Sequence, residues 1–274
     1  MKDLKGKTAY ITGGSSGIGL ATAKLLASKG VNVAIFARRQ PVLESALKEI
    51  SSCAGNPGQK FYYAVLDVSR HEDVGRVLQK AVEEFGLPDM LINCAGRARP
   101  GYFRDISYSQ FEETIKIDLY GTWNTCALLA PRMKRGSSIV NTSSVVGFIG
   151  VFGYSDYAAA KFGVIGLSET LRSELKPQGI TVSILCPPDT DTPGYAEENR
   201  TKPPETVAVS DVASIMKPEQ VAAALVTGML KGRPYIVPSA NARFTWIGKR
   251  LAPWLAELVM DFQIRGVQKQ KKSG

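Results

Sequence analysis

A glycine-rich turn near the N-terminus constrains the fold more than any other stretch of the sequence. It reads Thr12-Gly13-Gly14-Ser15-Ser16-Gly17-Ile18-Gly19, between an apolar strand at residues 8–12 and a helical pattern that stops at Gly30. Backbone N–H groups and a helix N-terminus can approach a pyrophosphate in such an arrangement. We therefore expect dinucleotide binding here. The residues expected to contact the dinucleotide are Gly13, Ser15, Ser16, Gly17, Ile18 and Gly19.

Strand and helix patterns alternate along the rest of the chain. Further apolar strands are predicted at residues 31–37, 61–66, 89–93, from Ile139, at 181–186 and at 235–237. Seven strands joined by six mostly helical crossovers predict an α/β fold, a Rossmann-like, doubly wound parallel sheet with helices on both faces. We expect a single domain over residues 1–240, with a substrate loop at 187–216, followed by a basic amphipathic helical tail at 241–274.

The end of the second strand bears on the form of the dinucleotide. NAD sites usually offer a carboxylate here to the ribose hydroxyls, whereas this chain has Ala37, Arg38 and Arg39. Guanidinium groups suit a phosphate, so NADP is favoured over NAD. The alternative is that both arginines are simply solvated surface residues.

Two later strand ends also belong to the expected cofactor site. Asp67 and Val68 follow the third strand, and Asp67 is placed to accept a hydrogen bond from the adenine amino group. The fourth strand closes with Asn93-Cys94-Ala95-Gly96, where small residues let the backbone lie against the cofactor. The cofactor contacts expected from this second segment are Asn93, Ala95 and Gly96.

Tyr157 and Lys161 form the pair with the clearest chemical potential. Residues four apart lie on one face of a helix, so the Lys161 ammonium can approach the Tyr157 phenol. A nearby cation lowers the pKa of a tyrosine from its ordinary value of about 10. Ser144, or its neighbour Ser143, ends the preceding strand and can supply a hydroxyl for the reacting oxygen. Taken alone, such a pair is more often an ordinary feature of a helix.

Composition excludes several other chemistries. The four cysteines, at positions 53, 94, 126 and 186, are widely spaced, and His71 is the only histidine. A zinc site, a disulfide framework and a Ser/His/Asp triad are therefore disfavoured, and we expect no metal. The polar N-terminus and the lack of an apolar run of about 18 residues predict a cytoplasmic protein without a signal peptide or spanning helix.

The motifs together closely resemble the short-chain dehydrogenase/reductase family over about residues 5–240. The resemblance implies that Tyr157 protonates the substrate carbonyl, that Lys161 lowers its pKa and holds the nicotinamide ribose, and that Ser144 orients the substrate oxygen. The hydride would come from NADPH. Asp118 stands where the family commonly has asparagine, so the proton relay is expected to differ. A homodimer or homotetramer is expected by resemblance.

The segment after the sixth strand adds a narrower resemblance. Residues 187–203 are similar to the corresponding loop of 3-ketodihydrosphingosine reductases, which implies a long-chain 2-amino-3-ketone as substrate. Pro187, Thr190 and Thr192 are expected near the nicotinamide end of the cofactor. The carboxylates available to meet a substrate ammonium are Asp189, Asp191, Glu197 and Glu198. The alternative is that the loop is a solvated lid that says nothing about the substrate.

The tail carries most of the net charge. Residues 231–274 hold nine Lys or Arg and two Asp or Glu, so nine minus two leaves +7 of the total of +9. Pro253 is expected to split the tail into two helices. Apolar residues recur at helical spacing: Phe244, Ile247, Leu251, Trp254, Leu255, Leu258 and Phe262. The tail is equally suited to a membrane interface and to packing on protein. The charge is confined to this tail without interleaved reading elements, so nucleic-acid binding is disfavoured.

Two other functions remain open from the sequence. Within enzymes, the chain could reduce another lipophilic ketone, such as a steroid or a long-chain acyl carbonyl. In a different class, it could be a catalytically silent dinucleotide-binding adaptor that works through its tail. The presence of Ser144, Tyr157 and Lys161 favours an enzyme, whereas Asp118 is the feature that fits a silent protein.

Overall fold

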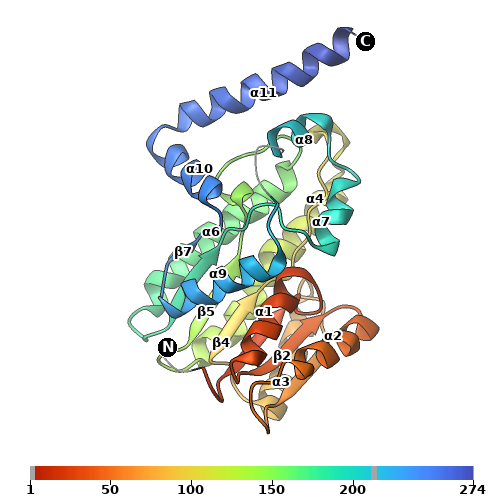
Figure 1. Ribbon diagram of the computed structural model, residues 1–274. Coiled ribbons are helices and arrows are strands. Elements are labelled where there is room, and N and C mark those ends of the chain that lie inside the picture. Colours follow the sequence, from red (N-terminus) through yellow and green to blue (C-terminus); the bar gives the residue numbers. More distant parts are fainter. Residues whose placement is uncertain (1–3, 211–214, 274) are drawn as a thin grey trace.

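Seven parallel strands form one sheet in the order β3-β2-β1-β4-β5-β6-β7 (Figure 1). The computed structural model describes residues 4–210 and 215–273. The strands are β1 (Thr8–Thr12), β2 (Asn32–Ala37), β3 (Phe61–Val65), β4 (Met90–Asn93), β5 (Ser138–Thr142), β6 (Thr181–Leu185) and β7 (Tyr235–Ile236). All seven predicted strands are present, and the α/β fold class is confirmed.

Helices join the strands and cover both faces of the sheet. They are α1 (Gly17–Ser28), α2 (Gln40–Ser52), α3 (His71–Phe85), α4 (Tyr108–Ile115), α5 (Gly121–Leu129), α6 (Ser155–Leu175), α7 (Pro193–Asn199), α8 (Pro204–Ser210), α9 (Pro218–Leu230), α10 (Ala240–Leu251) and α11 (Pro253–Ser273). Residues of α1, α2 and α9 share one apolar core with the sheet. Residues of α3, α5 and α6 share the core on the other face.

The central strands are apolar runs because both of their faces are covered. Tyr10 and Ile11 on β1 are fully buried, in different cores on opposite faces of the sheet. Side chains alternate between the faces of a strand, so a strand covered on both sides needs apolar residues throughout. The short runs of Val, Ile, Leu and Ala in the sequence follow from this burial.

The strand registers align the carboxyl ends at one edge of the sheet. Thr12 lies opposite both Phe36 and Asn93, and Asn93 lies opposite Asn141. The strand order reverses between β1 and β4, and ligands of doubly wound sheets bind in the crevice at such a point. The topology therefore brings the glycine-rich turn and the ends of β4 and β5 to one crevice.

One segment differs from the sequence-based expectations, and another contains an irregularity. The chain is helical from Tyr108 to Arg132, as its sequence pattern predicts, but residues Lys116–Tyr120 form a π-helical turn (the π-turn) between α4 and α5. The polar segment 187–216 contains two short helices, α7 and α8, and its residues 211–214 lie outside the described part. Thr192 caps α7 by accepting a hydrogen bond from the Tyr195 N–H at 3.1 Å, so a local cap favours a helix despite the polar composition.

The C-terminal helices form an arm over the carboxyl edge of the sheet (Figure 1). Helix α10 ends at Leu251 and α11 begins at Pro253, which confirms the predicted split. Helix α11 packs against α8 and extends across the top of the molecule in this view. Among the described residues, no helix has the length and hydropathy needed to cross a bilayer.

Candidate active site

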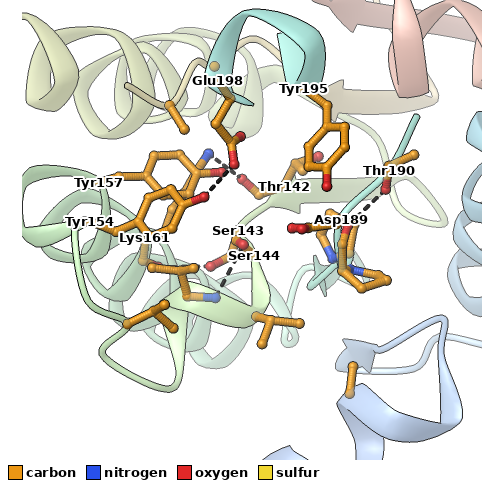
Figure 2. Close-up of a pocket in the computed structure, with 18 of the residues that line it drawn as sticks. Thr142, Ser143, Ser144, Tyr154, Tyr157, Lys161, Asp189, Thr190, Tyr195 and Glu198 are labelled. Atoms are coloured by element: carbon orange, nitrogen blue, oxygen red, sulfur yellow. Dashed lines mark hydrogen bonds between the residues drawn. The ribbon is translucent and has the colours of Figure 1, made fainter. Parts of the chain in front are cut away.

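A cavity of about 630 Å³ opens at the carboxyl ends of the strands. Its walls come from the glycine-rich turn, the ends of β4, β5 and β6, the start of α6, helix α7 and the arm. The sequence-predicted site residues among its lining are Gly13, Ser16, Gly17, Ile18, Gly19, Ala95, Gly96, Ser144, Tyr157, Lys161, Pro187, Thr190 and Thr192. Figure 2 shows the part of this cavity around Tyr157.

The glycine-rich turn has the shape that a bound pyrophosphate needs. Gly13 has φ +67°, and a Cβ there would lie 2.8 Å from backbone atoms of Cys94 and Ala95. Helix α1 begins at Gly17, with no acidic residue in its first turn. The positive end of the helix dipole therefore opens into the cavity without a competing carboxylate. These residues fit the pyrophosphate of a dinucleotide.

Tyr157 and Lys161 lie one turn apart on α6 and face the same cavity. The Lys161 Nζ atom is 5.3 Å from the centroid of the Tyr157 ring. It donates a hydrogen bond of 3.0 Å to the Thr142 carbonyl oxygen and lies 2.9 Å from Asp118 Oδ1. The strand end thus fixes the ammonium from one side and Asp118 fixes it from the other.

Asp118 is the buried counter-ion of Lys161. Its side chain is 0% exposed and that of Lys161 is 4% exposed. It lies in the π-turn between α4 and α5 and accepts the Arg97 backbone N–H at 3.3 Å. A Cβ on Gly96 would lie 2.5 Å from Asp118 Oδ1, so this contact requires glycine at position 96. Burial raises the pKa of Asp118, and the charge of Lys161 opposes this rise.

The pKa of Tyr157 differs from the expectation of a lowered value. Burial and the negative charges of Asp118 and Glu198 raise it well above 10.0, whereas a hydrogen bond with Ser144 lowers it. Asp118 lies 2.9 Å from the Lys161 ammonium. The negative charge of Asp118 therefore offsets the positive charge of Lys161 at the Tyr157 phenol. In this arrangement the pKa of Tyr157 is thus raised rather than lowered.

The two candidate serines have different surroundings. The Ser144 hydroxyl interacts with the Tyr157 phenol and lowers its pKa, and the Ser144 Oγ accepts the Val146 N–H at 3.2 Å. Ser143 instead donates to the Lys161 carbonyl oxygen at 2.9 Å. The Ser143 hydroxyl thus ties β5 to α6, and Ser144 is the hydroxyl placed to share a substrate oxygen with Tyr157.

Several predicted cofactor residues lie outside this cavity. Arg38 and Asp67 line a second hollow of about 290 Å³, together with Arg70 and Arg76. Although burial opposes it, hydrogen bonds from Ser69 and the charge of Arg38 lower the pKa of Asp67. The predicted residues that line neither hollow are Ser15, Arg39, Val68, Asn93 and Asp118.

Asn93 is held in a buried hydrogen-bond network. Its Nδ2 donates to Asn141 Oδ1 at 2.9 Å, and its Oδ1 accepts from Thr125 at 2.8 Å. Asn141 in turn donates to Ser168 at 2.9 Å. Asn93 thus joins β4 to β5 and α5, which is a supporting position beneath the cavity.

The structure adds residues that sequence reasoning did not identify. Tyr154 donates a short hydrogen bond to Glu198, and Lys202 pairs with both Glu198 and Asp189 (Figure 2 shows the acids and Tyr154). Ala242 and Thr245 of α10 line the cavity, as do Val259 and Met260 of α11. The helical periodicity of the arm was visible in the sequence, but the surface that each face contacts was not.

Comparison with known proteins identifies related chains. The family model described as short chain dehydrogenase matches residues 7–203. A 3-ketodihydrosphingosine reductase of Bos taurus is 40% identical over 232 residues, covering 84% of this chain and 70% of that protein. The 3-ketodihydrosphingosine reductase of Dictyostelium discoideum is 39% identical over 275 residues, covering 94% and 81%.

Two further similarities are broader. A 3-oxoacyl-(acyl-carrier-protein) reductase of Chlamydia muridarum is 37% identical over 191 residues, covering 69% of this chain and 76% of that protein. A short-chain dehydrogenase/reductase of Burkholderia phymatum, solved in complex with NAD, superposes with a TM-score of 0.81. It is 24% identical and covers 93% of this chain and 96% of that one, which supports the fold alone.

Proposed function

The chain belongs to the short-chain dehydrogenase/reductase family, a family of NAD(P)-dependent oxidoreductases, and on that premise we propose that it reduces 3-ketodihydrosphingosine to dihydrosphingosine with NADPH. One observation carries the proposal. A single cavity joins the glycine-rich turn to Ser144, Tyr157 and Lys161 and continues to the C-terminal arm. It provides for a dinucleotide, a proton donor and a long-chain substrate.

The proposed chemistry assigns each side chain a task. The bound nicotinamide supplies the hydride that reduces the ketone carbon. Ser144 and Tyr157 bind the ketone oxygen, and Tyr157 donates its phenolic proton to that oxygen as negative charge develops there. The raised pKa of Tyr157 keeps the phenol protonated at neutral pH, which suits an acid. Lys161 is placed to hold the nicotinamide ribose from the floor of the cavity.

Substrate and cofactor preferences rest on separate features. Relatives named 3-ketodihydrosphingosine reductase share 39–40% identity over 84% of the chain, and one named 3-dehydrosphinganine reductase shares 38% over the same fraction. Apolar side chains of the arm, among them Ala242 and Val259, line the cavity and suit an alkyl chain. Arg38 lines the hollow beyond β2, where a guanidinium can pair with a 2′-phosphate, which supports NADPH.

A turnover assay tests the proposal. Oxidation of NADPH is followed with 3-ketodihydrosphingosine, with a 3-oxoacyl thioester and with NADH in place of NADPH. We expect the fastest reaction with the amino ketone and NADPH. Tyr157→Phe should lower kcat by about 10²- to 10⁴-fold while NADPH binding persists. Preference for the thioester would favour the second candidate, the reaction named for the Chlamydia muridarum relative.

We also propose that the arm meets a lipid surface. Phe244, Leu251 and Phe262 are 74%, 81% and 81% exposed, and basic residues lie along the same two helices. Exposed apolar side chains beside positive charge are typical of helices that lie in a membrane interface. A surface contact of this kind would bring the mouth of the cavity to the source of a lipid substrate.

A further inference from the structure

Glu198 lies in the wall of the reaction cavity beside the predicted proton donor. It belongs to α7, its side chain is 16% exposed, and it accepts a short hydrogen bond from the Tyr154 hydroxyl. The Tyr154 and Tyr157 rings are 5.8 Å apart between centroids. Figure 2 shows Glu198 directed toward the hydroxyl groups of these two tyrosines. A carboxylate therefore stands where the groups next to a reacting ketone must lie.

One lysine faces two carboxylates at this end of the cavity. The Lys202 Nζ atom is 3.1 Å from Glu198 Oε1 and 3.4 Å from Asp189 Oδ2, and its side chain is 3% exposed. It also lies 4.3 Å from the centroid of the Tyr195 ring. Glu198 and Asp189 together carry two negative charges and Lys202 carries one positive charge, so the three side chains have a net charge of −1. A partly buried negative charge costs free energy unless a further cation binds beside it.

We propose that Glu198, assisted by Asp189, binds the ammonium group on the carbon next to the reacting carbonyl, and so makes this cavity selective for 2-amino ketones. The inference rests on the proposed function and deepens it. In such a substrate one carbon–carbon bond separates the amine-bearing carbon from the carbonyl carbon. A ketone oxygen on Tyr157 thus keeps the ammonium in the part of the cavity that Glu198 and Asp189 line.

Charge compensation adds a catalytic consequence. The charges of Glu198 and Asp189 both raise the pKa of Tyr157. An ammonium bound to Glu198 offsets this field, which makes the phenol a stronger acid when the amino ketone is present. Ketones without the amine do not offset the negative charges of Glu198 and Asp189, so the pKa of Tyr157 stays raised when they bind. The preference for 2-amino ketones should therefore appear in kcat as well as in binding affinity.

Glu198→Gln is the test variant because its amide oxygen can still accept the Tyr154 hydrogen bond. Two ketones of equal chain length are compared, 3-ketodihydrosphingosine and its deaminated 1-hydroxy-3-ketone analogue. We expect kcat/KM for the amino ketone to fall about 10- to 100-fold, the size of one lost charged hydrogen bond. For the analogue kcat/KM should not fall, because loss of the Glu198 charge only removes a field that no ammonium offsets there. Glu197→Gln is the matched control, since Glu197 is exposed and pairs with Arg200 at 2.8 Å. Equal loss on both ketones would overturn the proposal and leave Glu198 a structural role.

A binding measurement separates this inference from the proposed function. Calorimetry compares dihydrosphingosine with its uncharged N-acetyl derivative on the NADP-saturated protein. We expect the wild type to prefer the amine by about 10-fold or more and Glu198→Gln to lose that preference, whether or not the ketone is turned over. If the wild type bound both compounds equally, the ammonium site would be wrong even in an active reductase. If the amine preference held in a protein that did not reduce the ketone, only the proposed reaction would fail.

Discussion

Asp118 determines how Lys161 can act on Tyr157. The carboxylate and the ammonium lie 2.9 Å apart and are both buried, so most of the field of the lysine is cancelled at the phenol. The family commonly has asparagine at this position. A reduction needs the protonated phenol, and it remains available at any pH below the raised pKa. The reverse reaction needs the phenolate, so it demands alkaline conditions.

Asp118→Asn is expected to move the pH profile of alcohol oxidation to lower pH. The rate of this direction rises with pH through the pKa of Tyr157, which is above 10.0 in the wild type. Loss of the Asp118 charge removes one cause of the rise and frees Lys161, so the inflection should fall by about one pH unit or more. The measurement is kcat for dihydrosphingosine oxidation from pH 7 to pH 11. An unchanged inflection would show that Asp118 does not control the phenol.

Arg38→Ala should raise KM for NADPH about 10-fold and leave KM for NADH nearly unchanged, because a charged hydrogen bond to the 2′-phosphate is lost. Arg76→Ala is the matched control. Arg76 lines the same hollow but pairs with Asp73 at 2.8 Å. Steady-state kinetics with both cofactors measure the effect. An equal rise in KM for NADPH and for NADH would mean that Arg38 maintains the shape of the hollow and does not bind the 2′-phosphate.

Local spacing explains which site residues could be predicted. Tyr157 and Lys161 are four residues apart, so helical geometry alone brings them together. Tyr154 and Glu198 are separated by 44 positions, and their contact depends on where α7 lies relative to the N-cap of α6. A carboxylate in a polar loop carries no signal of its future burial. The pair was therefore beyond sequence reasoning, although Glu198 was among the carboxylates considered for an ammonium.

At the scale of elements, buried strands were predictable, whereas the short helices α7 and α8 were not. Each central strand is apolar because both faces are covered, so its signal is independent of its neighbours. Helices α7 and α8 are short and polar, and begin with proline. The π-turn at Lys116–Tyr120 cannot be predicted from the spacing of apolar residues in this stretch. It nevertheless supplies the buried carboxylate beside Lys161.

The hydrogen-bond network under the cavity is expected to stabilise the junction of β4, β5, α5 and α6. Asn141 is 0% exposed and bonds with Asn93 and Ser168. Asn141→Leu would leave buried polar partners unsatisfied, so the free energy of unfolding should fall by about 1–3 kcal/mol. Urea denaturation measures the change, with far-UV circular dichroism as the check on folding. An unchanged midpoint would contradict a structural role for the network.

At the scale of the whole molecule, the arm has two different surfaces. Ala242, Thr245 and Val259 line the cavity, whereas Phe244, Leu251 and Phe262 are largely exposed. The sequence shows the amphipathic spacing but cannot say which face meets the domain. Leu255, which belongs to the predicted stripe, has a side chain outside the described part. The boundary predicted at residue 240 stays a prediction, and the arm beyond it contributes wall to the cavity.

Flotation with liposomes tests the proposed membrane contact without opening the cavity. A triple variant, Phe244→Ser, Leu251→Ser and Phe262→Ser, changes exposed side chains of the arm and leaves the cavity wall intact. We expect the wild type to float with vesicles that contain about 30% anionic lipid, and binding to weaken as salt rises, because about 1 kcal/mol per basic residue is electrostatic. The triple variant should stay unbound while its kcat for detergent-dispersed substrate is retained. Equal flotation of both proteins would show that the exposed apolar side chains do not take part in membrane binding. If neither protein floated, the alternative that this face packs on another protein would be favoured.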